Sequence, residues 1–226
     1  VYKDWSVKDI AKKIFSFSDG ATFSAKKDAI VNIGGLLLMN DKDLFEKAKN
    51  ELIIREGFTT YGGLAGRDIN AMAVGLKEGC DEKYLEYRTG QIKFIHDKLV
   101  EAKIPVISPP GGHAIYINAG EILSHIPSKH FPAQAFSIEC YIEGGIRSVE
   151  IGSVMLSFIS PETKKMVYPK LELVRFAFPR RTYTLSHILY VIDIIIAVCK
   201  RCKTIKGVEI TEAPELLKHF SASFNW

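Results

Sequence analysis

The chain has 226 residues, of which 47% are hydrophobic and 25% charged, and its mean hydropathy is +0.05. This composition excludes a disordered tail or a collagen-like repeat and provides apolar material for one large core or two modest ones. Lys and Arg outnumber Asp and Glu by 30 to 26, and the basic residues are scattered. Nucleic-acid binding therefore has no compositional support.

The sequence opens at Val1 without an initiator Met, a basic segment or an apolar signal segment. We expect the middle of a longer polypeptide here and not a secreted start. The most apolar run, 189–198, is about half of the ~20 residues that a bilayer span requires, and it contains Asp193. It predicts a buried helix and no membrane segment.

Four cysteines are too few and too unevenly spaced for a disulfide framework, which favours a reducing, cytoplasmic setting. Cys199 and Cys202 form a C-x-x-C pair that could be half of a zinc site or a redox motif. No second pair accompanies it, so two thiols near a helix end are the favoured interpretation.

Helical and strand patterns alternate in the first part of the chain. Ser6 and Asp9 resemble a capping box before a helix expected at 7–17. The continuous apolar run at 30–39 predicts a strand buried on both faces, as in parallel sheets covered by helices. A helix capped by Asp41 or Asp43 follows, with Gly57 as its stop.

Two further helices are expected between residues 68 and 103, divided near 79–81. The second helix is long, and its apolar stripe faces inward with Leu85, Ile92, Ile95 and Leu99. A long helix of this kind often connects two lobes. Short strand-like runs then alternate with helices that begin near Pro132 and Thr184, and the first of these helices is expected to end at Gly144-Gly145. The expected strands are 104–108, 113–118, 148–153, 171–178 and 208–211.

This order predicts two domains. Residues 1–83 form part of a parallel α/β lobe, and residues 84–226 form a smaller α+β lobe.

Ser24-Ala25-Lys26-Lys27 precedes the expected buried strand. Small residues allow close approach of a ligand, a hydroxyl can bind a phosphate, and an amine near another cation has a lowered pKa. A Schiff-base lysine for pyridoxal phosphate (PLP) requires these features, although a solvated basic turn is the other interpretation.

Arg175 lies in the expected strand 171–178, where alternation places it on the face of Leu171, Leu173 and Ala177. A guanidinium among apolar neighbours needs a carboxylate, either from a ligand or from a structural ion pair. Structural or solvated roles are favoured for His113, His219 and Pro179-Arg180-Arg181. Tyr61-Gly62-Gly63 has the flexibility of a ligand loop but gives no nucleotide signal.

Several blocks taken together closely resemble the β-eliminating lyases, whose members act on tryptophan or tyrosine. The blocks cover essentially the whole chain in order: 24–29 with 32–35, 60–68, 111–114, 131–135, 145–152 and 174–180. The resemblance implies an α/β fold type I PLP enzyme, aspartate-aminotransferase-like, with a partial large domain and an α+β small domain.

The resemblance also implies residue roles. Lys27 would hold PLP and move the substrate Cα proton, Ser24 would bind the cofactor phosphate, and Lys26 would lie beside the cofactor. Asn32 would contribute to a potassium site. Arg175 would bind the substrate α-carboxylate, in agreement with the strand argument.

The side-chain pocket favours tryptophan over tyrosine. Ile151 stands where phenol-releasing members have an arginine, and an aliphatic side chain packs against indole but cannot stabilise a phenolate. The resemblance implies that Val149 would belong to the same pocket. His219 and Phe58 also resemble the tryptophan-specific members, with Phe58 reaching the pocket of a neighbouring subunit. The implied reaction converts L-tryptophan to indole, pyruvate and ammonia.

Family members are about twice as long, and their amino-terminal half carries groups that this sequence lacks, including the carboxylate that faces the pyridine nitrogen. We therefore expect activity only together with that half, in cis or in trans, in a homotetramer. One alternative is an inactive split or truncated lobe. Another is a lyase for tyrosine or another amino acid.

Overall fold

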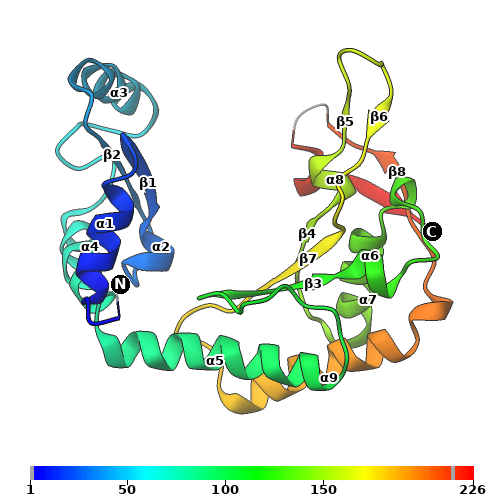
Figure 1. Cartoon of the computed structure of the whole chain (residues 1–226). Helices are drawn as coiled ribbons and strands as arrows, with labels where there is room; N and C mark the ends of the chain where they lie inside the picture. The colour runs from blue at the N-terminus through cyan, green and yellow to red at the C-terminus, as the bar shows by residue number, and fades with distance from the viewer. Residues whose placement is uncertain (1–2, 215–216) are drawn as a thin grey trace. The chain divides into compact units, whose positions relative to one another are not determined.

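The structure is a computed structural model that describes residues 3–214 and 217–226 (Figure 1). Val1 and Tyr2, with which the sequence opens, lie outside the described residues. None of the helices in the described ranges is both long enough and apolar enough to span a bilayer.

The chain divides into two compact units, Val1–Tyr87 and Arg88–Trp226. The division falls within the long helix α5 (Glu82–Glu101), a few residues after the boundary expected at Lys83.

Helices and one two-stranded antiparallel sheet make up the described part of the first unit (Figure 1). Its elements before α5 are α1 (Val7–Phe15), β1 (Gly20–Ser24), α2 (Ala25–Asp28), β2 (Gly35–Met39), α3 (Lys42–Arg55) and α4 (Gly66–Glu78). The predicted helix starts are confirmed by their caps. The Ser6 hydroxyl accepts from the Asp9 N–H at 3.2 Å, and the Asp41 carboxylate accepts from the Leu44 N–H at 2.7 Å.

The predicted parallel strand at 30–39 is wrong. Only Gly35–Met39 is extended, and it pairs antiparallel with β1 from Gly20↔Met39 to Ser24↔Gly35. Positive φ angles at Ile30 and Gly34 turn the preceding segment away from a strand. Leu37 and Leu38 remain exposed. An apolar run favours burial, but it does not specify which other element will cover it.

The second unit is α+β. Besides most of α5, it contains β3 (Ala114–Asn118), α6 (Ala119–Ile122), η1 (Ser128–His130), α7 (Pro132–Gly144), β4 (Val149–Ile151), α8 (Ser153–Leu156), β5 (Phe158–Ile159), β6 (Met166–Val167), β7 (Leu173–Ala177), α9 (Leu185–Lys200), η2 (Cys202–Thr204), β8 (Glu209–Glu212), η3 (Lys218–Phe220) and β9 (Ser223–Asn225).

A three-stranded antiparallel sheet of order β3-β7-β4 forms the centre of this unit (Figure 1). Its inner face packs on α7, and α7 packs on α9. The fully buried side chains include Phe136 of α7, Ile117 of β3 and Ile195 of α9. Four of the expected strands are confirmed, whereas 104–108 forms only an isolated bridge from Val106 to Ile117.

Local signals predicted the main helices of this unit correctly. Pro132 opens α7, which ends at Gly145 in the left-handed conformation (φ +66°). Thr184 caps α9, whose apolar run is buried at Ile192 and Val198.

Candidate functional site

Lys27 and Ser24 lie together at the junction of β1 and α2. Ser24 ends β1, and four residues of helix follow, which brings the Lys27 Nζ to 3.3 Å from the Ser24 Oγ. Ser24 occupies the N-cap position, yet its hydroxyl caps no backbone N–H. Lys27 is exposed and has no ion pair with a carboxylate among the described residues. A hydroxyl and an amine are thus both available to a ligand.

Close packing of α4 supports this segment. A Cβ placed on Gly75 would lie 1.6 Å from the Ala29 carbonyl oxygen, and one on Gly79 would lie 2.4 Å from that of Asp28. The glycines of α4 therefore allow its backbone to contact the end of α2 directly. Ala25 and Ala29, buried on either side of the lysines, contribute to the same contact together with Met72.

The other candidates in the first unit are exposed. Lys26 lies beside Lys27 on α2, and Asn32 lies in the loop between α2 and β2. Phe58 follows α3, with its ring centroid 6.4 Å from that of Tyr61. The described residues contain no cluster of three His, Cys, Asp or Glu side chains that could hold a metal ion.

Arg175 lies at the centre of β7, as alternation predicts, with Tyr116 opposite it on β3 and Val149 opposite it on β4. Its Nη2 is 3.0 Å from the Nε2 of His113. Because guanidinium only donates hydrogen bonds, this histidine nitrogen accepts. The Arg175 Nε is buried without a hydrogen-bond partner, and no carboxylate of the described residues pairs with the guanidinium.

Ile151 and Val149 lie on the same side of the sheet as Arg175, because residues 149 and 151 alternate with 150. His219 lies in η3, 4.1 Å ring to ring from Phe220. Contacts join η3 to α8, which begins two residues after Ile151, and the Lys218 amine donates to the Ser157 hydroxyl at 3.0 Å. The structure thus connects Ile151 to the His219 segment.

Sequence reasoning missed Arg88, which is 5% exposed. Its Nη2 donates to the carbonyl oxygen of His113 at 3.3 Å and to that of Phe178, holding together the adjacent ends of β3 and β7. Arg88 lies three residues after Leu85 and four before Ile92, in step with the apolar stripe of α5, so a charged residue at a stripe position was the available signal of this contact.

Sequence reasoning also missed Glu150 and Glu172, which are buried on the inner side of the same sheet. Burial raises the pKa of Glu150, and Glu172 nearby adds to this, whereas backbone N–H groups of Val154, Gly152 and Met155 oppose it. In β4 the apolar Val149 and Ile151 alternate with Glu150, a pattern that predicts the glutamate on the solvent side, so alternation carried no signal of its burial.

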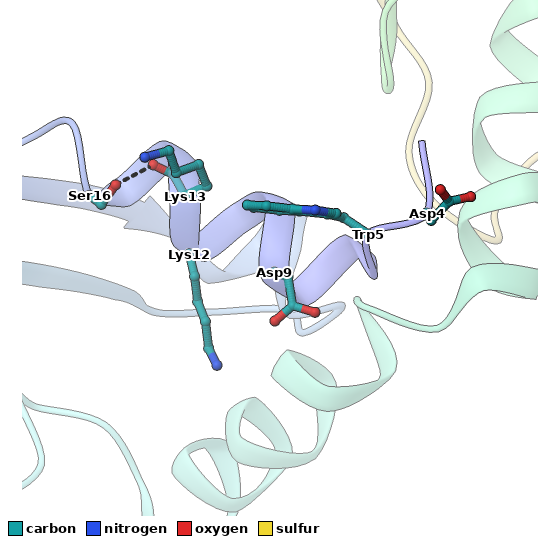
Figure 2. A pocket seen from close by; sticks show the side chains of 6 residues that line it. All are labelled: Asp4, Trp5, Asp9, Lys12, Lys13 and Ser16. Carbon is teal, nitrogen blue, oxygen red and sulfur yellow. Dashed lines mark hydrogen bonds between the residues drawn. The ribbon is translucent and has the colours of Figure 1, made fainter. Parts of the chain in front are cut away.

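A shallow depression lies along α1, lined by Asp4, Trp5, Asp9, Lys12, Lys13 and Ser16 (Figure 2). Figure 2 shows the Asp9 and Lys12 side chains extending away from the helix, while the Ser16 hydroxyl donates to the Lys13 carbonyl oxygen at 2.7 Å. None of the predicted site residues lines it.

Comparison with solved structures defines the class of fold. Two structures described as SPT with PLP, one of them with the PLP internal aldimine, match with a TM-score of 0.50 at 12–13% identity. Each match covers 86% of this chain and 43% of the other chain. The fold is therefore that of part of a fold type I PLP enzyme.

The family model described as beta-eliminating lyase matches residues 4–194, and the chain belongs to this family. Tryptophanase from Salinibacter ruber is 50% identical over 221 residues, which are 98% of this chain and 46% of that protein. Tyrosine phenol-lyase from Pasteurella multocida is 46% identical over 223 residues, 99% of this chain and 48% of that protein. The chain thus spans about half the length of these relatives.

Proposed function

We propose that the chain is the carboxy-terminal half of a PLP-dependent lyase that eliminates indole from L-tryptophan. The observation that carries this proposal is the Lys27 amine 3.3 Å from the Ser24 hydroxyl, in a segment that matches the family. Both groups are free of competing partners in the described part of the chain, as a covalently held, phosphate-bearing cofactor requires.

Lys27 would hold the cofactor through its amine, and the same amine would move the proton at the substrate Cα. Ser24 binds the phosphate and Lys26 lies beside the cofactor. When bound, PLP supplies an electron-withdrawing ring that stabilises negative charge at Cα. The exposed Lys27 on α2 and the half-buried Ser24 just before this helix fit such a group.

Arg175 binds the substrate α-carboxylate. Its unpartnered Nε and the absence of an ion pair with any described carboxylate favour a ligand over a structural salt bridge. His113 keeps the guanidinium in place through its Nη2.

Tryptophan is the proposed substrate because Ile151 and Val149 present aliphatic side chains on the Arg175 side of the sheet. Such a surface packs on indole, whereas a phenolate would need a cation there. His219, supported on α8, and Phe58 complete the proposed pocket, Phe58 from a neighbouring subunit of a homotetramer. Asn32 contributes to a potassium site, and the location is cytoplasmic.

The whole enzyme requires an amino-terminal half, encoded in the same polypeptide or as a separate chain. The surface of the first unit supports this part of the proposal, because Phe17, Ile14 and Leu37 are each more than half exposed. An inactive lobe is the second candidate, favoured by the same exposure and by the partial coverage of the relatives. Tyrosine elimination is the third, because relatives with that name are nearly as similar.

The test is elimination by the whole enzyme. Indole release from tryptophan should exceed phenol release from tyrosine, and Ile151→Arg should lower the ratio by about ten- to a hundredfold. Ile159→Arg, the same change on the exposed β5 strand, should leave the ratio unchanged. Preferential phenol release would assign the tyrosine activity, and no release of either product would favour the inactive lobe.

A further inference from the structure

Two carboxylates are buried beneath the proposed substrate pocket. Glu150 and Glu172 are each 5% exposed, on the inner face of the sheet, and neither pairs with a cation among the described residues. A buried carboxylate without a cation must be satisfied by hydrogen-bond donors.

The donors are the first N–H groups of α8. Glu150 accepts from the Val154 N–H at 2.9 Å through Oε1 and from the Met155 N–H at 3.1 Å through Oε2. Glu172 accepts from the Ser153 N–H at 3.1 Å through Oε2 and contacts the Ser153 hydroxyl through Oε1. A four-residue helix cannot satisfy these N–H groups itself, so the two side chains hold it in place.

Gly152 makes this arrangement possible. A Cβ on this residue would lie 2.3 Å from the Glu172 Oε2 and 2.8 Å from the Glu150 Oε1. Both carboxylates therefore converge on the residue that follows Ile151, and any side chain there would displace them.

The held segment connects two parts of the pocket. Ile151 immediately precedes Gly152, and η3, which carries His219, contacts α8 on its other side. The bond from the Lys218 amine to the Ser157 hydroxyl reinforces that contact. Movement of α8 would shift both proposed pocket residues.

We propose that Glu150 and Glu172 are positioning residues that fix α8 and, through it, the specificity side chains Ile151 and His219. This rests on the proposed function only in assigning those two residues to the substrate. The two glutamates have unequal roles. Glu150 needs both oxygens as N–H acceptors, whereas Glu172 has one oxygen on a hydroxyl, which can accept as well as donate.

Glutamine substitution tests this asymmetry. In Glu150→Gln the amide NH₂ would face a backbone N–H, whereas in Glu172→Gln it can donate to the Ser153 hydroxyl. Hydrogen exchange of the chain, followed by mass spectrometry, should show amides 152–156 exchanging about tenfold faster in Glu150→Gln and nearly as in the parent in Glu172→Gln. Unchanged exchange in Glu150→Gln, or equal acceleration in both variants, would overturn the positioning role.

Substrate discrimination in the whole enzyme separates positioning from general destabilisation. Glu150→Gln should lower kcat/KM for tryptophan about tenfold more than for S-methylcysteine, whose small leaving group does not need the aromatic pocket. The exposed Glu162→Gln serves as the control and should change neither value. An equal loss with both substrates would contradict positioning. A parent enzyme that eliminates neither would refute the proposed function, and the exchange result would still decide whether the glutamates fix α8.

Discussion

Replacing Gly75 with alanine should separate α4 from the segment that carries Lys27. The added methyl carbon would lie 1.6 Å from the Ala29 carbonyl oxygen and 2.7 Å from its carbon. A flexible side chain could rotate to relieve this clash, but the backbone of Ala29 cannot. The helix α4 must therefore move away from the end of α2. Overpacking of this kind costs about 1–3 kcal/mol, of which the helix propensity of alanine returns about 0.5–1 kcal/mol.

Gly66 gives the matched control. It begins the same helix, and a Cβ there would have no heavy atom within 4 Å. Alanine at this position should leave stability unchanged or raise it by up to about 1 kcal/mol.

Hydrogen exchange of the α4 amides measures both changes in one segment. Gly75→Ala should accelerate exchange by about tenfold, which corresponds to about 1.4 kcal/mol, and Gly66→Ala should not. Equal exchange in the two variants would refute the close contact between α4 and the lysine segment.

Three further outcomes are expected. Arg175→Met in the whole enzyme should raise the KM for tryptophan by about thirtyfold or more. Thermal stability should change little, because no ion pair within the described residues is lost. A large drop in Tm would instead indicate a structural role. Phe136→Ala should destabilise the second unit by about 3–5 kcal/mol in urea unfolding, and a loss below 1 kcal/mol would contradict its full burial. Burial raises the pKa of Cys199 to about 12 and also raises the pKa of Cys140. Iodoacetamide at pH 8 should therefore label the exposed Cys80 first. Rapid labelling of Cys140 in the folded chain would contradict this order.

Local signals predicted the second unit well. Pro132, Gly145 and Thr184 start or end helices through contacts within one helical turn. The alternation around Arg175 follows from strand geometry alone. These features do not depend on distant residues, and a single sequence therefore contains them.

The first unit was harder to predict. The apolar residues at 30–39 indicated a buried strand, but its length and partner depend on backbone turns at Ile30 and Gly34 and on pairing with β1. The close contact between Gly75 and Ala29 joins segments far apart in the chain, and periodicity carries no information about it.

The residues of the candidate site were also predicted only in part. The resemblance to the family supplied Lys27, Ser24 and Arg175, and strand alternation independently placed Arg175. Glu150 and Glu172 were missed, because their burial and their hydrogen bonds to α8 arise only once β4 and β7 pair.

Attachment of the cofactor tests the central claim most directly. The chain is incubated with PLP, reduced with borohydride to fix the cofactor to the amine that holds it, digested and examined by mass spectrometry. The account predicts a pyridoxyl group on Lys27, in preference to Lys26 and the other exposed lysines, and its loss in Lys27→Ala. Label on Lys26 instead, or spread evenly over the surface lysines, would contradict the account.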